Sequence, residues 1–404
     1  MLRPGRLIVL AVAMLALGCA GQLERLRVDR ADAELAPLVD SDAAGQLLAD
    51  LLARRSRDQR LASVEPGPHF TDVVEERDPE ADRLRDQERL RELGREVSVD
   101  FAALAFARAV SADSRSRAVQ AAFERFLQAG LERSAAALRR PRAFPYTVLF
   151  APSWLHRSHP ETGSDFARQR RLLDRLGIPN RLITSGESDS VEDNAAAIAA
   201  AVRAARSDND PVIVVSASKS GAEAALALSR LLTPEETTGV AAWINIAGAL
   251  RGTPLADTAM RPPASWMART IFWINGWNWA GLASMATEPS RRRLEGARVP
   301  EAITVVNVIA VPVSGSVGAT VYGGYRVLLS DGPNDGVVLL ANTVWPGGVN
   351  LVALGADHLF GRSREDAYML AVLRAVDVAV RLSGPAVEPT AAVEPTAAVE
   401  RNTD

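Results

Sequence analysis

The chain has 404 residues, but it contains one cysteine, four histidines and a single lysine, Lys219. With one cysteine, no disulfide can form within the chain. Its 46 lysine and arginine residues nearly balance 49 acidic residues, so the net charge of −3 gives no electrostatic reason to expect a nucleic-acid partner. A hydrophobic content of 48% allows a large core. Because histidines are few, the search for a catalytic base is short.

The first residues predict a secretory signal peptide over 1–18, with Arg3 and Arg6 ahead of an apolar run over 7–17. That run is too short for an ordinary membrane span. Residues 15–19, LALGC, resemble the lipobox of bacterial lipoproteins, in which cleavage before the cysteine is followed by its lipidation. The resemblance implies a lipid on Cys19, and Ala20 implies sorting to the outer membrane. We therefore expect a lipid-anchored protein of the bacterial envelope that faces the periplasm; the alternatives are a plain signal peptide and an uncleaved anchor.

Residues 19–142 form an arginine-rich N-terminal extension that is largely helix-forming. Leucines three and four residues apart predict amphipathic helices over 45–61 and 82–95. This extension holds no catalytic constellation, and we expect a helical cap or a segment that holds the protein away from a membrane. At the other end, 384–404 repeats PTAAVE and lacks aromatic residues, which predicts a disordered tail.

The pattern changes over 143–383, where short β-type runs alternate with helical stretches. The predicted strands are 146–150, 181–184, 211–216, 240–247, 302–312 and 350–354. Such alternation is typical of an α/β fold with a mostly parallel sheet flanked by helices. A functional site is expected at the carboxyl ends of the strands.

One segment, at about 251–300, interrupts this alternation. It is apolar on nearly every side and carries five large aromatic residues: Trp266, Phe272, Trp273, Trp277 and Trp279. A solvated helix would not show this pattern. We interpret the segment as an apolar helical cap or lid over a substrate site, with a buried helical pair as the alternative.

A nucleophile motif is predicted directly after the β-branched run 212–215. There the chain passes through a few small residues and enters a helix-forming stretch. A sharp turn between a strand and a helix lifts a serine hydroxyl above the sheet edge. The usual motif is G-x-S-x-G, whereas this chain has Ser216 and Ser220 on either side of Ser218, followed by Gly221. Ser218 is therefore the candidate nucleophile.

The candidate base is His358, the one histidine that follows the last predicted strand. Asp335 lies 23 residues before it, in an Asn-Asp-Gly turn, which gives the chain order Ser218, Asp335, His358. Asp331 and Asp257 are rival acids. His156 and His159 follow the first strand, and we expect them at a pocket rim or in solvent, because two loop histidines without thiolates are a weak metal signal.

Three stretches of 145–382 together resemble the α/β-hydrolase superfamily, and within it bacterial lipases and esterases. SASKSG resembles the GHSxGG elbow, RGTPLAD over 251–257 resembles a G-[ST]-P-L-A-D stretch, and NDGVV with a later DHL resembles the acid and base segments. The resemblance implies cleavage of carboxylic esters, with acyl esters or lipids as substrates.

The same resemblance implies roles for individual residues. Ser218 would attack the acyl carbon, His358 would carry the proton, and Asp335 would hold the imidazolium. The backbone N–H groups of Lys219 and Trp154 would form the oxyanion hole. We expect neither a cofactor nor a metal.

Two other functions are considered. Residues 216–219 also match the S-x-x-K motif of penicillin-binding proteins and serine β-lactamases, but those enzymes need a second lysine, which this chain lacks. A catalytically inactive hydrolase fold that serves as an envelope scaffold or binding lipoprotein is the other alternative, because both elbow glycines are replaced.

Overall fold

The computed structural model describes residues 35–62, 83–139, 144–205, 210–360 and 365–383. The predicted signal peptide, Cys19 and the predicted tail lie outside these residues. No helix within the described ranges is both long and apolar enough to cross a membrane.

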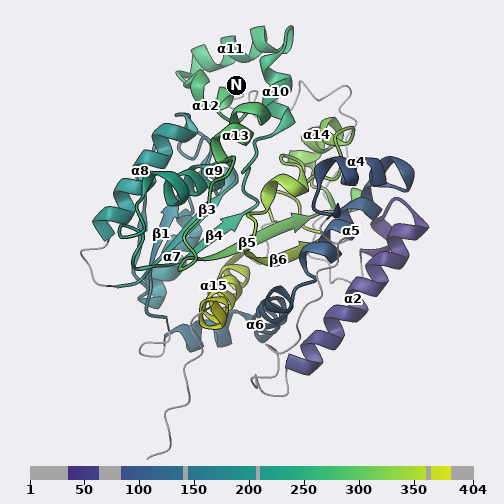
Figure 1. The fold of residues 1–404 in the computed structure, drawn as a ribbon, viewed down its shortest axis with the longest axis vertical. Helices are drawn as coiled ribbons and strands as arrows, with labels where there is room; N and C mark the ends of the chain where they lie inside the picture. The colour runs from purple at the N-terminus through teal and green to yellow at the C-terminus, as the bar shows by residue number, and fades with distance from the viewer. Residues whose placement is uncertain (1–34, 63–82, 140–143, 206–209, 361–364, 384–404) are drawn as a thin grey trace, which may run out of the picture.

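A six-stranded sheet lies at the centre of the protein, with the strand order β2-β1-β3-β4-β5-β6 (Figure 1). All neighbouring strands are parallel. Strand β5 is buried along its whole length, as is typical of a parallel sheet covered on both faces. The strands are β1 (Thr147–Ala151), β2 (Asn180–Leu182), β3 (Val212–Ala217), β4 (Val240–Ile246), β5 (Thr304–Val311) and β6 (Val349–Leu354).

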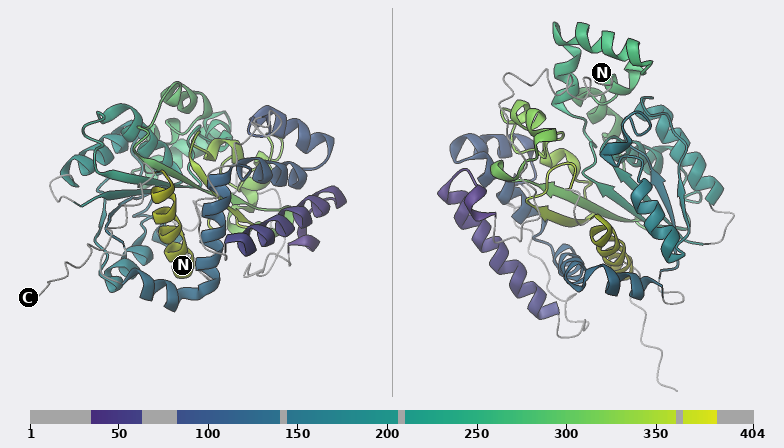
Figure 2. Two further views of the ribbon diagram at one scale, coloured as in Figure 1. Left: turned by 60° about the horizontal axis from the view of Figure 1, so that its bottom comes forward. Right: turned by 180° about the vertical axis from the view of Figure 1, so that it is seen from behind.

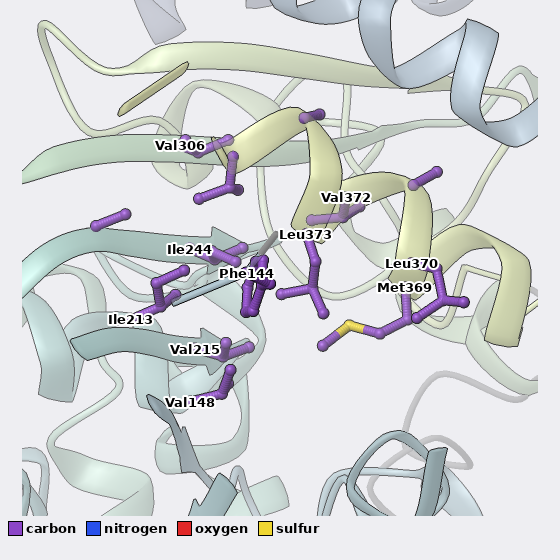
Figure 3. Packing of buried hydrophobic residues seen from close by; sticks show 14 of the residues in the cluster. Phe144, Val148, Ile213, Val215, Ile244, Val306, Met369, Leu370, Val372 and Leu373 are labelled. Atoms are coloured by element: carbon purple, nitrogen blue, oxygen red, sulfur yellow. The ribbon is translucent and has the colours of Figure 1, made fainter. Parts of the chain in front are cut away.

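Helices cover both faces of this sheet. Helices α6 (Ser114–Leu138), α7 (Ala167–Leu176) and α15 (Glu365–Ser383) pack on one face. Figure 3 shows the α15 side of that core, where Met369, Leu373 and their neighbours lie near side chains of β1, β3 and β4. Helices α8 (Val191–Ala205) and α9 (Lys219–Leu226) pack on the opposite face around the buried Trp243.

This layered parallel sheet has the α/β-hydrolase fold, which confirms the fold predicted from the sequence. The candidate serine follows β3 in the middle of the sheet, the candidate acid lies between β5 and β6, and the candidate histidine follows β6. All three therefore belong to loops at the carboxyl edge of the sheet, where sites of parallel α/β folds lie.

The segment between β4 and β5 forms a helical cap that projects from one end of the molecule (Figures 1 and 2). Its helices are α10 (Pro254–Met260), α11 (Ala264–Asn275), α12 (Trp279–Ala283) and α13 (Thr287–Leu294). Phe272 and Trp277 of the cap are buried against Leu155, which lies in the loop after β1. The cap therefore covers part of the carboxyl edge of the sheet.

The N-terminal extension packs along the β6 edge, with helices α2 (Asp42–Ala62), α4 (Gln87–Glu96) and α5 (Val99–Val110) beside it (Figure 2). A free strand edge exposes unpaired backbone groups. Here α6 satisfies them: the Gln120 side chain bonds both the N–H (2.8 Å) and the carbonyl (3.3 Å) of Val352, and the Ser116 hydroxyl accepts from the N–H of Asn350 at 2.9 Å. The extension thus completes the sheet edge.

Three buried asparagines continue this polar link across the sheet. Asn245, Asn307 and Asn350 occupy paired positions on β4, β5 and β6. Their amides are joined by hydrogen bonds of 3.1 and 3.0 Å, and Asn350 donates to the carbonyl of Val110 in α5 at 2.9 Å. Because a buried polar group needs a partner, this row of amides fixes both the register of the strands and the position of α5 against them.

A buried carboxylate, Asp100 in α5, holds the extension to the loop after β5. Its oxygens accept from the backbone N–H and hydroxyl of Ser314, both at 2.8 Å, and from the N–H of Asp40 at 2.8 Å. Burial and, to a smaller extent, the nearby charge of Asp40 together raise the pKa of Asp100 to about 6 against these hydrogen bonds. The folded chain therefore binds the proton of the Asp100 carboxyl group more tightly than the unfolded chain does.

This shift predicts a pH dependence of stability. The contribution of Asp100 to the free energy of unfolding should be greatest below the ordinary aspartate pKa of about 4 and should fall, by at most about 3 kcal/mol, as the pH rises through about 6. The measurement is urea unfolding of wild type and Asp100→Asn between pH 4 and 7. The difference between the two proteins should decrease with pH, and Asp40→Asn should move that decrease to lower pH. A difference that stays constant or grows with pH would contradict the prediction.

Candidate functional site

Ser218 lies at the junction of β3 and α9 in a strained backbone conformation, with φ 51° and ψ −122°. A positive φ is uncommon for a residue with a side chain, and such strain is found at functional sites. Three backbone hydrogen bonds hold it there: its N–H donates to Ile246 at 3.0 Å, and its carbonyl accepts from Gly221 at 3.0 Å and from Ala249 at 2.9 Å. Ser218 is therefore fixed at the carboxyl end of β3.

The two serines that replace the usual elbow glycines are both buried and hydrogen-bonded. The hydroxyl of Ser216 accepts from the indole N–H of Trp243 at 2.8 Å. The hydroxyl of Ser220 donates to the carbonyl of Ala151, at the end of β1, at 2.8 Å. Both substitutions therefore add bonds to neighbouring strands and leave the strained turn intact.

The usual elbow glycines permit two backbone segments to approach closely. In this chain that approach is made at Gly221, one position after Ser220. A Cβ on Gly221 would lie 2.6 Å from the Cα of Gly248, in the loop after β4. Real Cβ atoms do not come this close to backbone, so glycine is required where α9 crosses that loop. The glycine next to the motif therefore supplies the room for this crossing.

His358 and Asp335 are in direct contact. The Nδ1 of His358 lies 2.7 Å from Oδ2 of Asp335, and the His358 backbone N–H donates to the Asp335 carbonyl at 2.9 Å. The other carboxylate oxygen of Asp335 accepts from the N–H groups of Val337 (2.9 Å) and Val338 (2.7 Å). With Asp335 fully buried, its carboxylate is fixed in orientation and presents one oxygen to the imidazole.

This contact sets the electrostatics of His358. Burial lowers the pKa of His358, but the charge of Asp335 and its hydrogen bond to the imidazole outweigh burial, so the net pKa is raised. A carboxylate on Nδ1 also leaves Nε2 as the nitrogen that can exchange a proton with a substrate.

The rival acids make other contacts. Asp257 accepts from the N–H and hydroxyl of Thr287 in the cap, at 3.1 and 2.7 Å. Asp331 engages α4 through its backbone carbonyl. Of the three acids considered from the sequence, Asp335 is the one that contacts His358. Within the described residues no hydrogen bond joins Ser218 to His358, so the structure brings Asp335 and His358 together and places Ser218 separately on the same edge.

The two histidines after β1 were expected at a pocket rim or in solvent. His156 and His159 are both buried, so the solvent alternative is wrong. His156 Nδ1 lies 3.1 Å from the carbonyl of Ser153, and His159 Nδ1 lies 2.9 Å from Glu161. Burial lowers the pKa of His156. No cluster of three or more metal-ligating side chains occurs in the part of the chain that the structure describes.

The two predicted oxyanion donors lie at equivalent positions just beyond the ends of the neighbouring strands β1 and β3. Ala151 pairs with Ser216, and Trp154 and Lys219 each lie three residues further on. Neither of their backbone N–H groups donates to another described residue. Lys219 is the first residue of α9, where N–H groups have no partner within the helix and attract negative charge.

The side chain of Lys219 forms a buried ion pair with Glu223, one helical turn away. Both side chains are 2% exposed, and Asn194 donates to the same Glu223 oxygen at 2.9 Å. Burial raises the pKa of Glu223 although Lys219 and Asn194 both act to lower it. The lysine ammonium also lies 5.8 Å from the ring centre of Trp154, so this pair connects α8, α9 and the loop of the second predicted oxyanion donor.

The N-terminal extension supports the loop that carries Asp335. Gln87 donates to the carbonyl of Asp331 at 2.6 Å, and the Nε of Arg91 donates to the carbonyl of Ser330 at 2.9 Å. Between β5 and this loop lies α14 (Ala319–Leu328), whose Gly324 packs on the backbone of Gly336, next to Asp335. No residue pattern predicts this support, because its contacts end on backbone carbonyls, which leave no residue-type signal.

No protein-family profile matches this chain, and no curated protein sequence matches it. Among solved structures, it is similar to a metagenomic carboxyl esterase (24% identity, 59% of this chain and 76% of the esterase, TM-score 0.48) and to a Bacillus licheniformis lipase in its mature form (23%, 54% and 86%, TM-score 0.45). It is also similar to phospholipase PlaB from Legionella pneumophila (15%, 49% and 45%, TM-score 0.34).

The buried Lys219–Glu223 pair generates a prediction. Lys219→Met or Glu223→Leu alone should lower the free energy of unfolding by about 3–5 kcal/mol, because each leaves an uncompensated buried charge. The double variant Lys219→Met/Glu223→Leu should recover most of that loss, as measured by urea unfolding. Arg292→Met is the matched control: it breaks the exposed pair with Glu288, also one turn apart, and should cost less than about 1 kcal/mol. Additive losses in the double variant would contradict the prediction.

Proposed function

We propose that this protein is a serine hydrolase that cleaves carboxylic esters through an acyl-enzyme intermediate, with Ser218 as nucleophile, His358 as base and Asp335 as its partner. The observation that carries the proposal is the 2.7 Å contact between a buried aspartate and a histidine on the sheet edge that also holds Ser218 in a strained turn. A buried Asp–His pair that orients one imidazole nitrogen is what serine acyl-transfer chemistry requires.

In the proposed mechanism, the Ser218 hydroxyl attacks the acyl carbon of the ester while His358 Nε2 removes its proton. Asp335 stabilises the imidazolium that forms. The negative charge on the former carbonyl oxygen is held by the N–H groups of Lys219 and Trp154. His358 then protonates the leaving alcohol, and the acyl-enzyme forms. A water molecule, deprotonated by His358, then attacks the acyl carbon, and His358 returns the proton to Ser218 as the acid leaves.

The substrate class follows from the cap. Phe272 and Trp277 are buried beside Trp154, so the surroundings of the second oxyanion donor are aromatic and suit an apolar acyl group. Location is part of the same proposal: the sequence over 1–19 supports a lipid anchor at Cys19 in the bacterial envelope, where lipids and other acyl esters are at hand.

The nucleophile is tested by labelling with a fluorophosphonate probe. Wild-type protein should be labelled, and Ser218→Ala and His358→Ala should lose labelling together with up to about a million-fold in turnover of a chromogenic ester. Ser220→Gly and Ser216→Gly, which restore the usual elbow glycines, are the matched controls and should stay labelled. Labelling that survives Ser218→Ala would move the nucleophile to another serine. No labelling of correctly folded wild type would support the inactive scaffold instead.

The raised pKa of His358 predicts the pH profile. The base must be neutral to accept a proton, so kcat/KM should rise with pH through a midpoint above the ordinary histidine value of about 6.5. Asp335→Asn removes the charge that raises this pKa and leaves burial, which lowers it. The midpoint should therefore move to lower pH, with a loss of about ten-thousand-fold in kcat. A midpoint that does not move, or that moves up, would exclude Asp335 as the partner of the base.

A further inference from the structure

Helix α11 of the cap exposes an unusually large apolar surface. Of the eight large hydrophobic residues that are exposed in the described ranges, four lie on this helix: Trp266 (69% exposed), Met267 (44%), Trp273 (82%) and Ile274 (64%). On a helix of 3.6 residues per turn, these positions form one continuous face. Single exposed hydrophobic residues are ordinary, but a contiguous patch that contains two tryptophans indicates an interaction surface.

The opposite face of the same helix is already packed against other aromatic residues. Phe272 is 3% exposed, with its ring centre 6.1 Å from that of Trp154, 5.7 Å from Trp277 and 5.3 Å from Trp279. Ala268 is also fully buried. The fold of the cap is therefore held from the inner face, and the outer tryptophans contribute little to its packing. Of the five aromatic residues predicted to cover the substrate, Trp266 and Trp273 face away from the site.

The charge of the cap indicates which kind of partner the exposed face of α11 would bind. Between 254 and 294 there are five arginines and two acidic residues, in a chain whose net charge is −3. Both acids are engaged, Asp257 with Thr287 and Glu288 with Arg292. Helix α11 itself has no acidic residue, and its Arg269 lies over the ring of Trp279 at 4.5 Å beside the exposed face. A tryptophan-rich apolar face flanked by arginine is complementary to an anionic lipid surface.

We propose that the outer face of α11, formed by Trp266, Met267, Trp273 and Ile274, docks on an anionic lipid bilayer. In this arrangement the helix lies in the plane of the interface with its tryptophans at the headgroup level. Its inner face packs on the Trp154 loop, so one helix thickness, about 10 Å, separates the lipid from that loop. Docking in this way deepens the proposed function, because the substrate becomes an ester drawn from a membrane. Only this statement about the substrate rests on the proposed function.

The test is co-sedimentation of the full chain with phosphatidylcholine vesicles that contain either no phosphatidylglycerol or about a third of it. All proteins carry Cys19→Ala, so a lipid anchor contributes to none of them, and Ser218→Ala, so binding is measured without hydrolysis. Trp266→Ser/Trp273→Ser/Ile274→Ser should reduce binding to the anionic vesicles at least about tenfold. The matched control, Val97→Ser/Leu231→Ser/Leu382→Ser, removes three exposed hydrophobic residues elsewhere and should bind like the parent.

Quenching of tryptophan fluorescence by brominated lipids gives the position of the face. Quenching should occur with anionic vesicles, decrease with added salt, and be lost in the α11 variant. Equal binding by the α11 variant and the control would overturn the proposal, as would equal binding to neutral vesicles. A concentration-dependent dimer that only the α11 variant loses, without vesicle binding, would assign the face to a second copy of the chain.

The outcome for docking is separate from the outcome for catalysis. Hydrolysis of a soluble short-chain ester by the wild-type protein tests the proposed function without vesicles. If that hydrolysis is absent while the vesicle result holds, the docking face stands without the enzyme. If hydrolysis occurs but neither protein binds vesicles, the docking proposal fails and the enzyme stands.

Discussion

The position of His358 depends on one buried carboxylate. Asp335 uses one oxygen for two backbone N–H groups, the other for the imidazole, and its own carbonyl for the N–H of His358. Because the two loops meet at this residue, a shift of either loop would break several bonds at once, and a fully buried carboxylate could not exchange them for bonds to solvent. This explains why so much surrounding structure, from α14 to Gln87 and Arg91 of the extension, is directed at the segment that carries Asp335.

The elbow shows how a strained turn tolerates an altered motif. The constraint is geometric: a helix must cross the loop after β4 closely while Ser218 keeps a positive φ. In this chain the crossing is made at Gly221 and Gly248, so Ser216 and Ser220 are free to take side chains. Their hydroxyls then bond Trp243 and the end of β1. Replacement of the usual glycines is therefore no argument, by itself, for an inactive scaffold.

The periodic signals of the sequence predicted the six strands within a few residues, and the amphipathic helices predicted over 45–61 and 82–95 correspond to α2 and α4. Strands predicted over 302–312 and 350–354 correspond to β5 and β6, and the Asp335–His358 pairing follows from their order. The glycine-rich stretch before Asp335 gave no helix signal, yet α14 forms there, because the small residues allow it to pack closely on Gly336. The separation of Ser218 from His358 is set by loop conformation, which no residue pattern specifies.

The role of the extension could not be predicted for a different reason. Gln120 and Ser116 are polar residues on an amphipathic helix, and such residues ordinarily face water. Here they face the free edge of β6, where backbone groups need partners. A similar ambiguity affected the cap: a segment that is apolar on nearly every side is either buried or placed against an apolar partner. Helix α11 is buried on its inner face alone. The residues of its outer face are therefore suited to an apolar partner outside the fold. The excess of arginine in the cap indicates that this partner carries negative charge.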